Sequence, residues 1–250
     1  MKIHTRYLKL PGKNFVAQVF LVIVSIFVLQ SCHDNDANPI NAYDYFPVKV
    51  GQFSIFEVNQ VVYALGQKDS VVTKWQEKDE VTKLLKTDNG VQTFILSRFT
   101  RNAASGTWQK VKEFSIQQFP DKIIETVDNE VNVPLLFPID SNLKWDGYMY
   151  FNLNEEDYRY GYKNSYQNIN KPLAVGAISF DNTLMVKERF DTSMTDYKVA
   201  QKYYALNVGL ICAEQADFEY LQYNGDFIGD KVIASGQRKT RKIIAYGQNN

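Results

Sequence analysis

Beyond residue 45, extended segments and turn-forming residues follow one another in regular succession along the chain. Asp88-Asn89-Gly90 is the clearest hairpin signal, because Asn and Gly adopt positive φ angles at little cost. We expect strands over 52–63, 71–86, 91–101, 107–119, 122–127, 131–137, 173–180, 182–190, 193–205 and 208–223, with a last strand within 235–247. This succession predicts a mainly β fold with a single antiparallel domain, built as a curved meander, a half-barrel or a sandwich.

The amino-acid composition supports this fold class. Aromatic residues are abundant, with 16 Tyr, 16 Phe and 3 Trp, whereas runs rich in Ala and Leu are scarce, and this balance favours strands. No internal repeat, low-complexity tract or interdomain linker interrupts residues 45–250. One continuous domain is therefore expected there.

A short apolar segment at residues 16–29 precedes the expected domain. Four basic residues and no acidic residue stand ahead of it, as in a secretory signal peptide; they are Lys2, Arg6, Lys9 and Lys13. As a helix this segment would extend only about 21 Å, against a bilayer core of roughly 30 Å. We therefore favour a helical signal peptide over an uncleaved membrane span.

The segment closes with Leu29-Gln30-Ser31-Cys32, which resembles a lipobox: an aliphatic residue lies three positions before a cysteine, and a small residue lies directly before it. The resemblance implies that Cys32 carries thioether-linked diacylglycerol and becomes the acylated N-terminus. Acyl chains buried in the bilayer would then anchor the chain in the cell envelope, at the outer membrane, on its periplasmic or its outer side. A signal peptide that is cleaved without lipid attachment is the alternative.

Three regions are therefore expected: a signal peptide over residues 1–31, an acylated flexible tether over 32–44 and the β-rich domain over 45–250. The tether is polar, and its Asp34 and Asp36 are either solvated spacer residues or part of a sorting signal. Removing residues 1–31 leaves 219 of the 250 residues, with 24 basic and 28 acidic side chains. A mildly acidic domain has no electrostatic feature that favours nucleic acid.

Residues for the common kinds of catalysis are scarce. The only histidines are His4 in the signal segment and His33 in the tether, so the expected domain has no imidazole for a Ser-His or Cys-His pair or for a usual zinc site. Cys212 lies among Leu210, Ile211 and Ala213 and is expected to be buried and inert. We therefore expect no enzyme activity, no cofactor, no metal site and no catalytic residue.

Aromatic residues in the middle of the chain are the candidate binding residues. Trp145, Tyr148, Tyr150, Tyr158 and Tyr160 could form a platform on which a sugar stacks, although aromatic residues of strands more often fill the core.

Two charged segments add further alternatives. The carboxylates of Glu155, Glu156 and Asp157 could serve a glycan hydrolase, or they could lie in a solvated turn. The basic run Arg238-Lys239-Thr240-Arg241-Lys242 could contact anionic headgroups, but a solvated strand face is the simpler expectation.

Several segments together resemble a family of uncharacterised lipoproteins from Gram-negative bacteria. The matching segments are Tyr45-Phe46-Pro47 with Gly51, Phe137-Pro138 followed by Trp145-Asp146-Gly147, and Tyr204-Ala205 with Val208-Gly209-Leu210-Ile211. The resemblance implies an envelope location and a β-rich fold, but no activity, substrate or catalytic residue.

The sequence thus predicts a non-enzymatic envelope lipoprotein whose domain binds a ligand or partner, such as an envelope protein, a glycan or a lipid. One alternative is a carrier that encloses a hydrophobic ligand, which a continuous apolar cavity would favour and a filled interior would disfavour. The other alternative is a carboxylate-dependent glycan hydrolase.

Overall fold

A computed structural model describes residues 41–65, 69–86, 91–157, 159–224, 226–227 and 231–249. The expected signal peptide, Cys32, most of the tether and the hairpin turn at 88–90 lie outside these residues. The described part of the chain belongs to one compact unit that begins at Asn41. Among the described residues, no helix has the length and apolar character needed to cross a bilayer.

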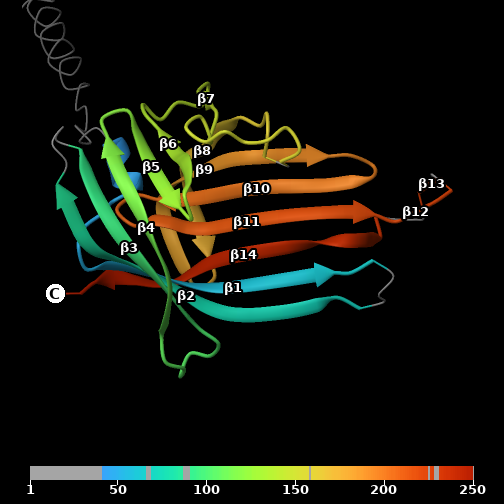
Figure 1. The fold of residues 1–250 in the computed structure, drawn as a ribbon, viewed down its shortest axis with the longest axis horizontal. Helices are drawn as coiled ribbons and strands as arrows, with labels where there is room; N and C mark the ends of the chain where they lie inside the picture. The colour runs from blue at the N-terminus through green and yellow to red at the C-terminus, as the bar shows by residue number, and fades with distance from the viewer. Residues whose placement is uncertain are drawn as a thin grey trace, which may run out of the picture. The chain divides into compact units, whose positions relative to one another are not determined.

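One large antiparallel sheet makes up almost all of this unit (Figure 1). A short 3-10 helix, η1 (Ala42–Tyr45), precedes the strands. The strands are β1 (Gln52–Tyr63), β2 (Val71–Lys86), β3 (Gln92–Arg101), β4 (Gln109–Phe119), β5 (Lys122–Val127), β6 (Glu130–Leu136), β7 (Lys144–Trp145), β8 (Asn164–Val175), β9 (Ile178–Thr192), β10 (Asp196–Ala205), β11 (Gly209–Tyr220), β12 (Gln222–Tyr223), β13 (Asp226–Phe227) and β14 (Ile233–Gln248).

Twelve strands lie in the order β6-β5-β4-β3-β2-β1-β14-β11-β10-β9-β8-β7, and β12 and β13 form a separate pair. Most neighbours in the large sheet are also neighbours in the chain. The main exception is β14, the last strand in the sequence, which lies between β1 and β11 in the sheet. The predicted mainly β, single antiparallel fold is confirmed.

The sheet curls until its two outer strands meet. β6 and β7 stand at opposite ends of the strand order, yet the Val133 amide donates to the Gly147 carbonyl at 2.7 Å. The indole Nε1 of Trp145 donates to the Val133 carbonyl at 2.8 Å, and the Tyr166 hydroxyl bonds to Leu136. These contacts make the sheet nearly closed and barrel-like, so its concave face becomes an interior.

Alternation along the strands supplies the core of this interior. Facing pairs in the register of β3 and β4 are Phe94 with Ile116 and Leu96 with Phe114. Side chains two positions apart on a strand point to the same face, so such pairs form a continuous apolar surface. The core also takes in Tyr166 and Tyr204, and η1 contributes Tyr45.

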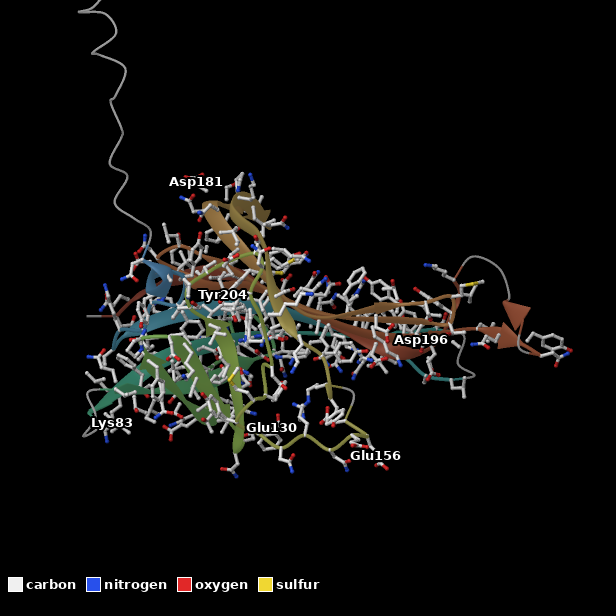
Figure 2. The ribbon with its side chains drawn as sticks, turned by 90° about the horizontal axis from the view of Figure 1, so that it is seen from above. Lys83, Glu130, Glu156, Asp181, Asp196 and Tyr204 are labelled. Atoms are coloured by element: carbon white, nitrogen blue, oxygen red, sulfur yellow. The ribbon has the colours of Figure 1, made fainter. Side chains whose placement is uncertain are left out.

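Several strands continue beyond the curled part. Figure 2 places Tyr204, near the end of β10, inside the body, and Asp196, at the start of the same strand, in a thinner extension of the sheet. The register continues into this extension, for example between Val62 and Val71 of β1 and β2. Lys202 lies between Asp196 and Tyr204 on β10.

The structure differs from the expected strand boundaries most between residues 164 and 192, where β8 begins at Asn164 and β9 extends from Ile178 to Thr192. The predicted strand 173–180 is interrupted, because β8 ends at Val175 and Gly176 takes a positive φ of 60° in a turn before β9. The compact unit includes Asn41 to Asp44, which precede the expected domain. Asn41 caps η1, and the Tyr43 hydroxyl donates to the Phe119 carbonyl at 2.7 Å, which fixes this segment to β4.

Candidate ligand-binding interior

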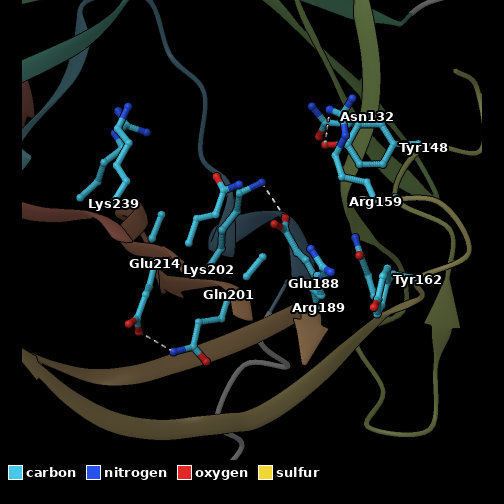
Figure 3. Close-up of a pocket in the computed structure, with 16 residues that line it drawn as sticks. Asn132, Tyr148, Arg159, Tyr162, Glu188, Arg189, Gln201, Lys202, Glu214 and Lys239 are labelled. Atoms are coloured by element: carbon cyan, nitrogen blue, oxygen red, sulfur yellow. Dashed lines mark hydrogen bonds and ion pairs between the residues drawn. The ribbon is translucent and has the colours of Figure 1, made fainter. Parts of the chain in front are cut away.

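Two adjoining pockets occupy the concave side of the curled sheet. The first, here called the apolar pocket, has a volume of about 230 Å³. Its apolar wall includes Phe56, Val81, Leu96, Phe114, Ile116 and Tyr204. The second, here called the charged pocket, has a volume of about 260 Å³ and appears in Figure 3. Its charged lining consists of Arg159, Glu188, Arg189, Lys202, Glu214, Lys239 and Arg241.

Strand periodicity explains why a charged zone directly adjoins an apolar one. On β3, Leu96 and Arg98 are two positions apart, so both point into the interior. Lys202 and Tyr204 are related in the same way on β10. Each of these two strands therefore contributes an apolar side chain to the core. Two residues away, on the same face of the strand, it contributes a charged side chain at the edge of the core.

An ion network lies on the wall formed by β2, β3 and β14. Asp79 accepts two hydrogen bonds from Arg98, at 2.6 Å from Nε and 2.8 Å from Nη2, and a third from Nη2 of Arg241 at 2.9 Å. Glu77 is buried beside it, and its Oε1 accepts from the Trp75 indole at 3.0 Å. Its Oε2 lies 2.8 Å from Arg241 Nε, without the alignment of a hydrogen bond.

This network keeps Asp79 ionised inside the protein. Burial acts to raise the pKa of the Asp79 carboxyl, but the charges and hydrogen bonds of Arg241 and Arg98 outweigh it and lower the pKa below 3.8. Burial likewise acts to lower the pKa of Arg98, and the bonds to Asp79 raise it instead. The interior therefore holds fixed ionic groups at neutral pH.

Lys202 projects from β10 toward Glu188 of β9, as Figure 3 shows. Its Nζ lies 2.6 Å from Glu188 Oε1. Burial acts to lower the pKa of Lys202, but Glu188, Tyr204 and Glu125 together outweigh burial and raise the pKa above the usual value. Lys239 of β14 behaves differently: burial lowers its pKa, and the nearby Arg241 and Arg98 act in the same direction against Glu77. Burial is therefore the main reason that the pKa of Lys239 is lowered.

The loop between β7 and β8 borders the charged pocket. Its Arg159 forms a two-point ion pair with Glu130 of β6, at 2.7 and 3.1 Å, and also pairs with Asp157 at 2.7 Å. The guanidinium carbon of Arg159 lies 4.7 Å from the centre of the Tyr148 ring. These contacts hold the loop against β6, so that Tyr148 and Arg159 become part of the pocket wall.

Four of the five aromatic residues predicted to form a stacking platform are among the described residues, and Tyr158 lies outside them. Trp145 is only 3% exposed and belongs to the core, where it packs against Tyr166. Tyr148, Tyr150 and Tyr160 line one open hollow of the loop between β7 and β8, and Tyr150 and Tyr160 are exposed there. Tyr148 also lines the charged pocket.

The structure also shows the surroundings of Cys212, of the acidic residues 155–157 and of the basic run 238–242. Burial raises the pKa of the Cys212 thiol to about 11, which is consistent with an inert side chain. Glu155 and Glu156 are exposed, while Asp157 is paired with Arg159. Of the basic run, Arg241 does not lie on a solvated strand face as expected. Its side chain is largely buried, because Arg241 occupies an inward-facing position of β14 and pairs with Asp79 and Glu77.

Sequence reasoning did not identify the ionic groups of the interior. Arg98 shares its strand face with Phe94 and Leu96. A charged residue among the inward-facing apolar positions of a strand is the sequence signal that could have identified it. Lys202 shares its face with Tyr204 in the same way. Among the described residues, no group of histidine, cysteine or acidic side chains is arranged to hold a metal ion.

The fold and the site define a class: a mainly β protein whose nearly closed antiparallel sheet has an apolar and a charged pocket side by side on its concave face. No known family model matches the chain, and no curated protein is significantly similar to it in sequence.

Proposed function

We propose that this chain is a lipid-anchored envelope protein whose sheet domain binds a small, partly apolar ligand in the interior, without chemical conversion of that ligand. The observation that carries the proposal is the apolar pocket of about 230 Å³ inside the curl of the sheet. Concave sites with an apolar wall and a few polar groups are the usual form of small-molecule sites.

The size of the pocket bears on the kind of ligand. An apolar cavity of about 150 Å³ is large enough to hold benzene. The apolar pocket, at about 230 Å³, suits a ring system or a chain of medium length. This favours a binding protein for small molecules, or a carrier of them, over a protein that encloses the paired chains of a whole phospholipid.

The envelope location rests on the sequence alone. The basic start, the apolar segment 16–29 and Leu29-Gln30-Ser31-Cys32 support export followed by acylation of Cys32. The polar residues after Cys32 would hold the domain away from the bilayer. Ligand binding and anchoring are separate parts of the proposal and are tested separately.

Binding of a neutral fluorescent probe tests the ligand site. N-phenyl-1-naphthylamine is titrated into residues 33–250, which contain the whole compact unit that begins at Asn41. We expect saturable binding to one site. Val127→Phe introduces a ring into the wall of the apolar pocket and should weaken binding about tenfold or more.

Thr126→Phe is the matched control, because Thr126 is the preceding residue on β5 and points to the opposite face. It should leave probe binding within about twofold of the unmodified protein, a difference well below 1 kcal/mol. Absence of saturable binding, or equal binding by the Val127→Phe protein, would contradict the proposed ligand site.

A further inference from the structure

We propose that the ligand is an anionic amphiphile: a medium-length apolar chain with a carboxylate head. The chain would lie in the apolar pocket and the head at the junction with the charged pocket. This inference rests on the proposed function and makes it specific. Its basis is the two cationic side chains shared by the pockets, their orientation by acidic partners and the volume of the apolar pocket.

Lys202 and Arg241 mark the junction between the pockets. Among the described residues, these two line both the apolar and the charged pocket. Lys202 is followed on its strand face by Tyr204, which is part of the apolar wall. A ligand that extends from the apolar pocket toward the charged one must therefore pass two cationic side chains.

The pocket lining carries charges of both signs. Six basic side chains line the two pockets together: Arg98, Arg159, Arg189, Lys202, Lys239 and Arg241. Four acidic side chains line them: Asp79, Glu125, Glu188 and Glu214. Four further acidic side chains pair with the basic groups from outside the lining: Glu77, Glu130, Asp157 and Asp217. An anionic head is therefore favoured by the position of Lys202 and Arg241 at the junction, and not by an excess of positive charge.

The cations are already oriented by their acidic partners. Glu188 takes one of the three N–H donors of the Lys202 ammonium, so the same group can also donate to a ligand oxygen. Asp79 holds the guanidinium of Arg241 at 2.9 Å. Fixed donors of this kind lose little conformational entropy when a ligand binds, which favours affinity.

The volume of the apolar pocket limits the chain length. A water molecule occupies a share of about 30 Å³ in the liquid, and a methylene group is of similar size. A pocket of about 230 Å³ therefore holds roughly eight such groups. Octanoate is a suitable probe, and 1-octanol is its neutral counterpart with the same chain length.

The test compares these two ligands by calorimetric titration of residues 33–250 at neutral pH. A hydrogen-bonded charge pair contributes about 1.5–3 kcal/mol, so octanoate should bind about tenfold or more tightly than 1-octanol. The preference should fall when salt is added, because the head lies at a partly hydrated junction. This comparison requires no variant and cannot be affected by misfolding.

The double variant Lys202→Met/Glu188→Gln then tests the assigned cation without leaving Glu188 unpaired. We expect octanoate affinity to fall to about that of 1-octanol, a loss of about tenfold or more, while binding of neutral N-phenyl-1-naphthylamine is retained. Lys198→Met is the matched control. Lys198 is on the same strand, is paired with Asp196 at 3.4 Å and has the same side-chain exposure as Lys202, 27%.

The outcomes separate the two proposals. Equal affinity for octanoate and 1-octanol, or an octanoate preference unchanged in the double variant, overturns the carboxylate assignment while probe binding upholds the ligand site. Failure of the neutral probe and of both octyl ligands to bind overturns the proposed function itself. A loss in the Lys198→Met protein equal to that in the double variant would also overturn the assignment to Lys202.

Discussion

The interior ion network depends on pH most directly through the carboxyl group of Asp79. Its folded-state pKa lies below 3.8, because Arg241 and Arg98 outweigh the effect of burial. A carboxyl whose pKa is lowered by folding stabilises the folded state above its unfolded-state pKa. That contribution is lost as the pH falls through the folded-state pKa.

Asp79→Asn should therefore destabilise the protein strongly at neutral pH, by about 3 kcal/mol or more, because two largely buried guanidinium groups lose their carboxylate. The difference from the unmodified protein should shrink as the pH falls from about 4 through the lowered folded-state pKa of Asp79, because Asp79 is protonated first in the unfolded chain and only at lower pH in the folded protein. Urea unfolding at several pH values measures this difference.

Asp128→Asn is the control, since Asp128 is exposed and its pairing with Lys112 is at the surface. Its effect should stay below about 1 kcal/mol. A difference between the Asp79→Asn and unmodified proteins that does not change with pH would contradict the assigned role of Asp79.

At the scale of single residues, the sequence predicts core membership better than it predicts the site. Apolar positions such as Phe94 and Leu96 follow the period of two that places them inside. Arg98 follows the same period, but its partner Asp79 is on another strand. Their pairing depends on strand register, which local pattern does not specify.

At the scale of elements, the contacts between β6, β7 and β8 close the sheet. The Tyr166 hydroxyl donates to the Leu136 carbonyl at 2.7 Å and accepts from the Leu136 amide at 2.9 Å. The Tyr166 hydroxyl therefore bonds to both the amide and the carbonyl of Leu136, which lies on β6 at the other end of the sheet order. Tyr166 is also fully packed in the core.

Tyr166→Phe should lower the free energy of unfolding by about 2 kcal/mol or more, because a part-buried amide and carbonyl both lose a partner. Tyr160→Phe, at an exposed position of the preceding loop, should change it by less than about 0.5 kcal/mol. Chemical denaturation of both variants checks this. Equal stabilities would show that the hydroxyl does not hold the sheet closed.

β14 lies beside β11 in the sheet, and the two backbones approach each other closely at Gly236. This glycine has a φ of 123°, and a Cβ atom there would lie 2.0 Å from the Asp217 carbonyl oxygen. Gly236→Ala should therefore destabilise the protein by about 2–4 kcal/mol, through both backbone strain and overlap with the neighbouring strand. Thermal or chemical unfolding measures the loss.

Gly176→Ala separates these two causes. Gly176 also has a positive φ, 60°, but open space surrounds the position that its Cβ would occupy. We expect a loss of only about 1 kcal/mol, the backbone contribution alone. A loss at Gly176 as large as that at Gly236 would argue against a close approach of β14 and β11.

Strand existence was largely predictable from turn chemistry, and strand ends were less so. The expected segment 71–86 coincides with β2, and 122–127 coincides with β5. The turn at Gly176-Ala177 was missed because apolar residues continue on both sides of it. The closure by Tyr166 joins residues 30 positions apart in sequence, so local pattern gave no indication of it.

At the scale of the whole molecule, the proposal combines a membrane anchor with a binding domain. Cys32→Ser should abolish acylation, so the protein should leave the membrane fraction or remain unprocessed. Membrane fractionation and intact mass measure both effects. The Cys212→Ser protein is the control and should keep its lipid, because Cys212 lies within β11 of the folded domain. Unchanged fractionation and mass after Cys32→Ser would contradict the anchor.

The interior site belongs to this largest scale, which explains why the sequence did not reveal it. Its lining comes from β1 to β6, β8 to β11 and β14, from residues 46–48 before β1 and from the loop after β7. Neither pocket exists until the sheet curls and its outer strands meet. Of the aromatic residues predicted to form a stacking platform, Tyr148 lines the charged pocket through that loop. Most of the remaining wall comes from residues far from Tyr148 in sequence.

Photo-crosslinking tests the central claim, that the interior of the curled sheet is the binding site. An octanoate analogue with a diazirine on its chain is irradiated with the protein, and labelled peptides are identified by mass spectrometry. We predict adducts on interior residues of β3, β4 and β10, suppressed by excess octanoate. Adducts confined to exposed loops or to the thin extension of the sheet, or labelling that excess octanoate does not reduce, would contradict the account.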